Sequence, residues 1–236
     1  MRLVIDKDII TLFPDLRIGV VTGRGIQNGS ANEEVERIKQ SAAAGVRQNL
    51  STEALSQHPS ILAWREAYRC FGAKPKDHRP TAEALLRRIL RGEGIPTISR
   101  AVDLYLAVEA EFYLPIGGYD LDKVDGDIAL RRSAGDESFI PIGAAAAEET
   151  TTSGEVVYAD ARKVLTRRWN YRDCDAAKVT ADSQNIALFC EAPFPEIPTD
   201  QLRKCTDRLA DYLQRFCGGS ISVHFIEAQS KQVQEL

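Results

Sequence analysis

The chain has 236 residues, of which 44% are hydrophobic and 27% charged, a balance typical of a globular domain with a buried core. Its 30 Lys and Arg residues against 34 Asp and Glu residues give a formal net charge of −4. This charge argues against a nucleic-acid binder that relies on bulk positive charge, although it leaves room for a local basic patch. No apolar run approaches the roughly 20 residues of a membrane helix, and the five cysteines include no CxxC pair. We therefore expect a cytoplasmic protein with no membrane association, no metal site and no cofactor.

Helical patterns dominate the first half of the chain, over residues 30–112. Two short strands come before them, at Leu3–Ile5 and Ile18–Thr22, on either side of a turn at Phe13–Asp15. Apolar residues spaced three and four apart then predict amphipathic helices. These helices cover Asn32–Asn49, Ile61–Phe71, Thr81–Leu90 and Ile98–Glu111, and the last begins near Ser99 as a cap.

The second half has the pattern of a sheet, over residues 113–192. Short apolar runs separated by turn residues predict strands, at Ile128–Arg131, Val156–Asp160 and Ile186–Cys190. An amphipathic helix at Gln201–Phe216 and an alternating strand at Ile221–Ile226 follow, and the polar tail from Glu227 is expected to fray. The sequence thus predicts an α+β fold in which residues 1–236 form one domain.

The familiar catalytic signatures are missing. The chain contains no GxSxG, GxxxxGK[ST], GxGxxG or HExxH motif. Of its three histidines, His58 and His78 lie in polar, exposed-looking surroundings, and His224 alternates within a strand. A histidine-dependent triad is therefore not expected, and any hydrolysis must use backbone donors, carboxylates or the substrate itself.

A glycine pair marks the first segment of interest, Leu114–Asp120. Gly117 and Gly118 permit close approach of the backbone to a ligand, and their N–H groups are candidate oxyanion donors. The alternative is a plain tight turn between two elements.

Cations interleaved with aromatic residues mark the second segment, Leu165–Arg172. Arg167, Arg168 and Arg172 suit contact with phosphates, and the aromatic residues between them suit base stacking. The alternative is a strand whose Trp169 packs inside while the arginines extend into solvent.

The third segment, Asp182–Glu191, is a polar turn followed by an apolar strand that ends on a carboxylate. Glu191 at a strand end beside a cavity is a candidate for binding a cationic group or orienting water. The alternative is an ordinary solvated strand end.

In this order, these segments resemble the B3/B4 domain family, which comprises the editing module of the phenylalanyl-tRNA synthetase β subunit and its standalone relatives. The resemblance runs from about Phe13 to Glu191. It is carried by Phe71–Pro75, Pro80–Arg88, Ala101–Tyr105, Leu114–Asp120, Gly154–Asp160 and Arg167–Asn170.

The resemblance implies an α+β editing fold, with mixed or antiparallel sheets and flanking helices, that hydrolyses the ester between a wrong amino acid and its tRNA. Some standalone relatives are similar to deacylases that remove canavanine from the tRNA for arginine. Two departures affect what carries over. The synthetase module has a histidine in the turn that matches Gly117, and many relatives have Asn where this chain has Leu106.

We accordingly predict a deacylase acting in trans on mischarged tRNA, with canavanyl-tRNA(Arg) as the leading substrate and no required protein partner. Backbone N–H groups near Gly117 and Gly118 would hold the oxyanion, and a ribose hydroxyl would position the water. The predicted amino-acid pocket comprises Tyr105, Tyr119, Asp120, Ser183 and Glu191, and the predicted tRNA contacts are Arg167, Arg168 and Arg172. A module that binds tRNA or an amino acid without catalysis is the alternative.

Overall fold

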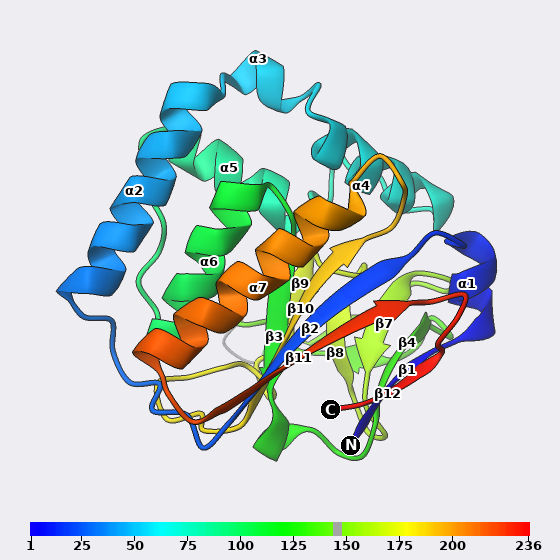
Figure 1. Ribbon diagram of the computed structural model, residues 1–236. Coiled ribbons are helices and arrows are strands. Elements are labelled where there is room, and N and C mark those ends of the chain that lie inside the picture. Colours follow the sequence, from blue (N-terminus) through cyan, green and yellow to red (C-terminus); the bar gives the residue numbers. More distant parts are fainter. Residues whose placement is uncertain (144–147) are drawn as a thin grey trace.

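In the computed structural model, which describes residues 1–143 and 148–236, helices come mainly from the first half of the chain and strands from the second (Figure 1). The helices are α1 (Lys7–Leu12), α2 (Glu33–Asn49), α3 (Thr52–Leu55), α4 (Pro59–Cys70), α5 (Thr81–Leu90), α6 (Arg100–Phe112) and α7 (Thr199–Phe216), with a 3-10 turn at Leu121–Lys123. The strands are β1 (Arg2–Ile5), β2 (Arg17–Arg24), β3 (Ile116–Asp120), β4 (Ile128–Arg132), β5 (Ser138–Phe139), β6 (Glu149–Thr150), β7 (Val156–Ala159), β8 (Val164–Arg167), β9 (Arg172–Asp173), β10 (Ile186–Ala192), β11 (Ser220–Glu227) and β12 (Val233–Glu235).

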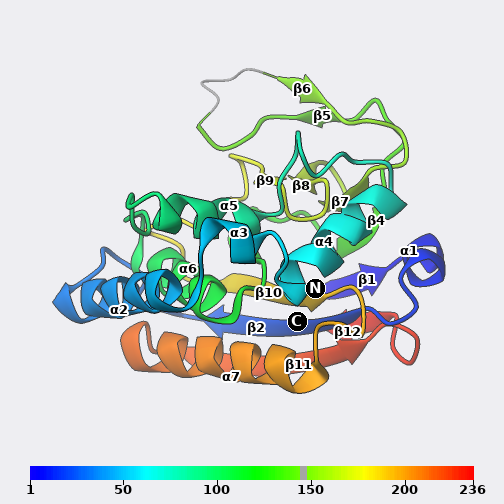
Figure 2. The ribbon, with the colours of Figure 1, turned by 90° about the horizontal axis from the view of Figure 1, so that it is seen from above.

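Two sheets organise these strands. The larger has the order β12-β1-β4-β7-β8-β9 and is mixed, because β1 and β4 run parallel while its other neighbours are antiparallel. The smaller has the order β11-β2-β10-β3 and is antiparallel throughout. Strands β5 and β6 form a separate pair that projects from the rest of the molecule (Figure 2). The protein therefore has the predicted α+β fold with mixed and antiparallel sheets.

Helix α7 packs on the smaller sheet, against β2, β10 and β11, and α6 packs against both α7 and α2 (Figures 1 and 2). The close approach of α7 to β2 depends on Gly19, since a Cβ atom there would lie 2.0 Å from the hydroxyl oxygen of Thr206. A buried ion pair joins α2 to α6, in which Lys39 Nζ lies 2.9 Å from Asp103 Oδ2. Among the described helices, none is long and apolar enough to cross a membrane.

The predicted helices and strands agree with the structure to within a few residues, because each carries a clear apolar period. Three local interpretations differ. Gly117 and Gly118 lie inside strand β3 rather than in a turn, since β3 pairs with β10 along its whole length. Helix α1 lies between β1 and the turn at Phe13–Asp15, where no element was predicted. The polar tail does not fray, because β12 pairs with β1 and Leu236 N donates to Met1 O at 3.0 Å.

Substituting Gly19 with alanine should destabilise the protein by about 1–3 kcal/mol, because the new methyl group overlaps Thr206 in a filled interior. Thr206→Ala leaves only its Cβ, 3.1 Å from that methyl position, so the double variant should regain much of the lost stability. Gly45→Ala is the matched control. Gly45 lies in α2 with no atom within 4 Å of the new Cβ, and this substitution should stabilise by about 0.5–1 kcal/mol. Urea unfolding of the four variants measures these differences, and a Gly19→Ala protein as stable as wild type would contradict the packing described.

Candidate active site

A small pocket opens between the two sheets, beside the first residue of α5. Its cavity volume is about 20 Å³, which is room for about one water molecule. Its walls come from β3, β7, β8, β9, β10 and the turn after β8. The lining residues are Thr81, Ile116, Gly117, Tyr119, Tyr158, Thr166, Trp169, Asn170, Asp173, Phe189 and Glu191.

A buried carboxylate on β10 anchors this pocket. Glu191 is 3% exposed, and its Oε1 accepts hydrogen bonds from Tyr158 Oη and, at 2.8 Å, from Trp169 Nε1. Burial raises the pKa of Glu191 to about 7, and the two hydrogen bonds only partly oppose that rise. The carboxylate is thus not the unpaired strand end considered from the sequence. It has two neutral donors and no cationic partner among the described residues.

Trp169 is held in an unusual backbone conformation. Its φ is +67° and that of Arg168 is +46°, in the left-handed region that large side chains seldom occupy. The ring is buried against Phe13 and Trp64, with ring centroids 4.7 and 5.1 Å away. Such strain costs on the order of 1–3 kcal/mol and is characteristic of functional sites. Here the left-handed backbone directs the indole N–H of Trp169 toward Glu191.

A second carboxylate is linked to the pocket by a chain of hydroxyl groups. Tyr119 Oη lies 2.5 Å from Thr166 Oγ1, which donates to Asp173 Oδ1 at 2.6 Å. Asp173 is half-buried, and the partial loss of water around its carboxylate raises its pKa to about 6. The Asp173 carboxyl group therefore changes its protonation state near pH 6.

A third carboxylate lies behind the pocket wall. Glu109, on α6, is fully buried, and neither of its oxygens makes a hydrogen bond of good geometry with a described residue, although the Thr81 side chain and the Ile116 backbone lie close enough to oppose the rise in its pKa. Burial raises its pKa to about 8, so the group is mainly protonated at neutral pH. Thr81 Oγ1 and Asn170 Nδ2, from two residues that line the pocket, are also buried without a partner. Unsatisfied polar groups of this kind are rare in folded proteins, and they mark a place where a ligand or water binds.

The pocket is acidic, because Glu191 and Asp173 line it and no Lys or Arg is among the lining residues. Phe189, Tyr119 and Tyr158 stack around it, with ring centroids 5.3–6.1 Å apart. Aromatic faces and carboxylates together favour a cationic group. Within the described part of the chain, no cluster of His, Cys, Asp or Glu is arranged to hold a metal ion.

The two glycines of β3 have different environments. A Cβ on Gly117 would lie 3.8 Å from Asp173 Oδ2, so this position borders the pocket space. A Cβ on Gly118 would lie 2.3 Å from the Ala187 carbonyl oxygen. The N–H of Asp120 donates to Ala177, away from β10. Because N–H groups alternate along a strand, that of Gly118 also points to the outer edge of β3, whereas that of Gly117 faces β10.

Of the predicted amino-acid pocket, the structure brings together Tyr119 and Glu191, and Gly117 of the predicted oxyanion pair lines the same pocket. Asp120 and Ser183 do not line the pocket, since Ser183 Oγ donates to Asp120 Oδ2 at 2.7 Å in an internal contact. Tyr105 lies on α6 outside the lining set.

The predicted tRNA contacts are largely engaged with acidic residues. Arg167 is 3% exposed, and its Nε and Nη2 pair with the two oxygens of Glu155 at 2.8 and 3.0 Å. Arg168 lies 3.7 Å from the same carboxylate. Arg172 is exposed but pairs with Glu149 at 3.0 Å. Arg167 therefore has an internal structural role.

Sequence reasoning missed Asp173, Thr166 and Glu109. Asp173 belongs to a two-residue strand that is too short to give a periodic signal. Glu109 lies on the apolar side of α6, and a Glu on a buried helical face was the one available signal. None of the three histidines lines the pocket.

Comparison with known proteins identifies the family. Residues 63–218 match the B3/4 domain. The chain belongs to the B3/4 domain family. This domain is associated with editing by aminoacyl-tRNA synthetases, and the family includes editing hydrolases. No significant match was found among curated proteins. An N-terminal fragment of the phenylalanyl-tRNA synthetase β subunit from Pyrococcus horikoshii is similar, at 14% identity and a TM-score of 0.46. The match covers 93% of this chain and 49% of that fragment, so this chain spans about half its length.

Replacing Glu109 with glutamine should stabilise the B3/4 protein, and more so as the pH rises. The unfolded chain loses the Glu109 proton near pH 4.5 and the folded protein near pH 8, so the wild type loses stability as the pH increases between these values. Glutamine does not ionise. The difference in the free energy of unfolding should therefore grow by up to about 1.4 kcal/mol per pH unit in that window.

Urea unfolding at pH 5 and pH 8.5 measures this difference. The control is Glu111→Gln, which changes an exposed carboxylate on the same helix that pairs with Arg208. That variant should show a small effect of similar size at both values. An equal effect of Glu109→Gln at pH 5 and pH 8.5 would mean that Glu109 is ionised in the folded state.

Proposed function

We propose that this protein is a trans-acting aminoacyl-tRNA deacylase, which hydrolyses the ester between a wrong amino acid and its tRNA in the cytoplasm. The observation that carries the proposal is the acidic, aromatic pocket beneath β3, with its unpartnered polar groups. Membership of the B3/4 family supports the reaction class, because the family includes editing hydrolases.

The α-ammonium group of the bound amino acid contacts the acidic side of the pocket. Glu191 and Asp173 are its candidate partners, since both line the pocket and neither is paired with a cation. A carboxylate that has been removed from water is stabilised when a cation joins it. Substrate binding should therefore lower the raised pKa values of both groups.

Hydrolysis requires a proton acceptor for water and a donor for the oxyanion. The attacking water, positioned by a ribose hydroxyl of the terminal adenosine, forms a bond to the ester carbon and gives up a proton that passes to the departing ribose oxygen. The carbonyl oxygen becomes an oxyanion that accepts a hydrogen bond from the Gly118 N–H at the outer edge of β3. The C–O bond to the ribose then breaks, and the departing ribose oxygen takes a proton. An activated ester needs no stronger catalyst than positioning and these groups.

Canavanine on the tRNA for arginine is the leading substrate. Its side chain ends in a guanidinium-like group, which forms paired hydrogen bonds with a carboxylate. Two carboxylates line the pocket, so one can hold the α-ammonium group and the other the side chain once the lining side chains move apart, because a cavity of about 20 Å³ is too small for an amino acid. Arginine differs from canavanine by one atom, so the pocket must detect that oxygen or the lower basicity it causes.

We expect Glu191→Gln to lower hydrolysis of canavanyl-tRNA by about 10- to 100-fold, the loss typical of a charged hydrogen bond. The variant should fold, because a glutamine oxygen can still accept from Trp169 and Tyr158. Single-turnover hydrolysis between pH 5.5 and 8.5 is the measurement. Wild-type activity should increase through about pH 7 as Glu191 ionises, and the variant should lack that component.

Glu196→Gln is the matched control for this variant, since it changes an exposed carboxylate five residues away. Wild-type rates and pH dependence in Glu191→Gln would remove Glu191 from substrate recognition. If wild-type protein hydrolyses another mischarged tRNA but spares canavanyl-tRNA, the canavanine assignment fails while the editing function stands. If it binds tRNA and hydrolyses none across a full set of amino acids, the protein is a binding module.

Gly117→Leu should abolish deacylation, because a leucine at this position extends from β3 into the pocket beside Asp173. Gly117→Ala should retain activity, since its Cβ makes only ordinary contacts at 3.8 Å. Circular dichroism checks the fold of both variants. Gly118 is unsuitable for this test, because any Cβ there collides with the backbone of β10. An active, folded Gly117→Leu protein would exclude the pocket as the site.

A further inference from the structure

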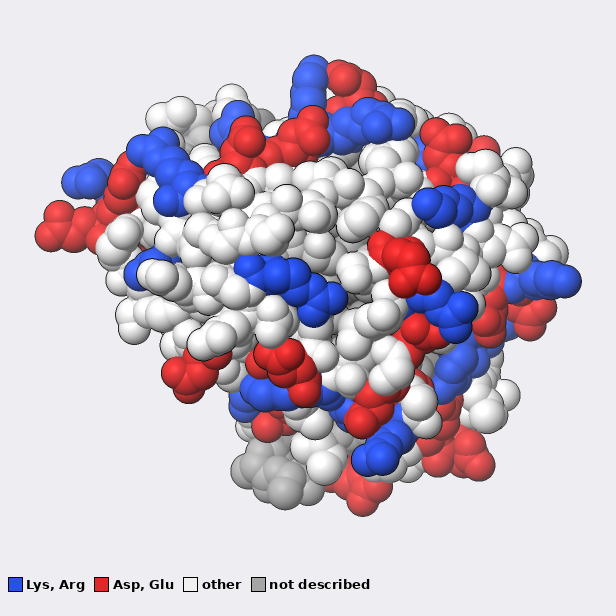
Figure 3. Space-filling model, turned by 60° about the horizontal axis from the view of Figure 1, so that its bottom comes forward, with Lys and Arg blue, Asp and Glu red and all other residues white. Residues whose placement is uncertain are grey.

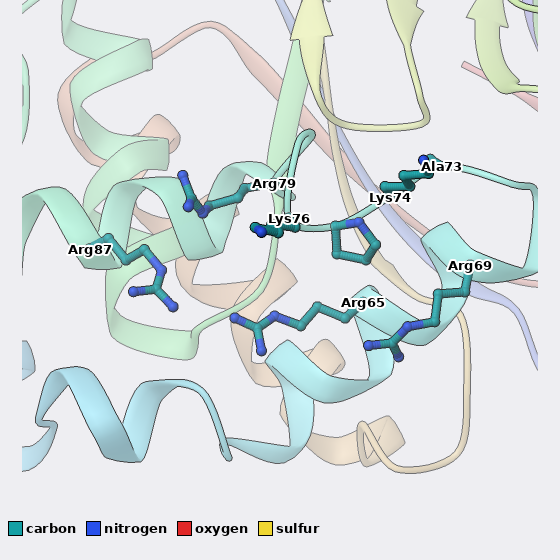
Figure 4. Close-up of a pocket in the computed structure, with 8 residues that line it drawn as sticks. Arg65, Arg69, Ala73, Lys74, Lys76, Arg79 and Arg87 are labelled. Atoms are coloured by element: carbon teal, nitrogen blue, oxygen red, sulfur yellow. The ribbon is translucent and has the colours of Figure 1, made fainter.

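A basic cleft lies between α4, the start of α5 and the loop that joins them. It encloses about 570 Å³, and six of its eight lining residues are cationic (Figure 4). These residues, here called the basic cleft, are Arg65, Arg69, Lys74, Lys76, Arg79 and Arg87, with Ala73 and Pro75 between them.

The cleft carries a local excess of positive charge in a chain of net charge −4. Glu83 and Glu66 are the carboxylates that pair with its cations, which leaves four positive charges uncompensated. Lys74 and Lys76 form no ion pair with any described residue and are exposed. By contrast, basic and acidic side chains are interspersed on the face drawn in Figure 3. The cleft is therefore a local site for an anion, distinct from the average charge of the surface.

A single buried carboxylate fixes the floor of the cleft. Glu83 Oε1 accepts from Arg65 Nη2 and Arg87 Nε, each at 2.7 Å, and its Oε2 accepts from Arg65 Nε at 2.8 Å. Figure 4 shows the side chains of Arg65 and Arg87 directed toward one another across the floor. Because a guanidinium has five N–H groups, donors remain for a ligand after these bonds are made. Two arginines are thus held in a fixed orientation, which lowers the entropy lost on binding.

The cleft adjoins the acidic pocket along the chain. Arg79 lines the cleft and Thr81 lines the acidic pocket. Two residues span at most about 7 Å of extended backbone. The two cavities are thus neighbours at the start of α5, and binding across both requires a ligand that reaches from one to the other. The two sites have opposite charge, as a ligand with an anionic backbone and a cationic end requires.

We propose that the basic cleft binds phosphodiester groups of the tRNA acceptor end and thereby directs the aminoacylated terminus into the acidic pocket. This inference rests on the proposed function for the identity of the RNA. Bidentate arginines and exposed lysines match phosphate oxygens, and the size of the cleft admits several such groups. Arg167 of β8 and Arg172 of β9, which have acidic partners, are not part of this surface.

The test compares two triple variants that remove the same charge. Lys74→Ala/Lys76→Ala/Arg79→Ala changes the exposed rim of the cleft and leaves the Arg65–Glu83–Arg87 floor in place. Lys7→Ala/Arg37→Ala/Arg47→Ala changes three exposed cations on α1 and α2. Binding of deacylated tRNA is measured by fluorescence anisotropy between 50 and 300 mM salt. The cleft variant should bind at least about tenfold more weakly at 100 mM, and its salt slope should fall by about 2–3, as expected for three lost phosphate contacts. The control should stay within about twofold of wild type.

Equal weakening of both variants, or of neither, would overturn the proposal. Inorganic phosphate and adenosine monophosphate are tested as competitors. If either binds the cleft as tightly as tRNA does, the cleft is a small-phosphate site and the proposal also fails. Deacylation by the wild type is assayed separately. Absence of turnover would contradict the proposed function, while the binding measurement would still decide whether the cleft holds RNA.

Discussion

The hydrogen bond from Trp169 Nε1 to Glu191 is the one among several contacts between the two sheets, within the described residues, that also involves the helical layer. Trp169 follows β8 in the larger sheet, and Glu191 lies on β10 in the smaller one. The indole is packed against Phe13 and against Trp64 of α4. One side chain therefore joins both sheets to the helical layer and also forms a wall of the pocket. The left-handed backbone at Arg168 and Trp169 persists because this packing outweighs its conformational cost.

Under the proposed function, the same arrangement explains how the pocket can act without a histidine. Glu191, Asp173 and Glu109 have pKa values raised by burial to about 7, 6 and 8, so all three change protonation near physiological pH. A carboxylic acid in such surroundings covers the range in which histidine normally acts. Burial destabilises the ionised form of these carboxylates, and a bound cationic amino acid offsets that destabilisation. In the proposed reaction, the burial that raises the pKa values of these carboxylates also strengthens their binding of a cationic substrate.

Helices and longer strands could be predicted from the sequence because their apolar periods are local. Membership of the family followed from the order of short motifs, and Glu191 was singled out as a carboxylate at the end of an apolar strand. Features that depend on distant partners could not be predicted. Strand β3 was interpreted as a turn, since its pairing with β10 involves residues about 70 positions later. Arg167 was assigned to tRNA because its internal partner, Glu155, becomes evident only in the fold. Asp173 was missed because two residues give no pattern.

The pairing of β1 with β12 has a consequence for synthesis of the protein on the ribosome. Strand β1 is complete after five residues, but one of its two neighbours in the sheet begins at Val233. Strand β2 likewise cannot form its sheet pairings until β10 and β11 have been synthesised. Nascent chains therefore expose unpaired strand edges for most of translation, and such edges associate with other chains. The helices α2 to α6 form from local contacts, whereas closure of both sheets occurs only after nearly the whole chain has emerged.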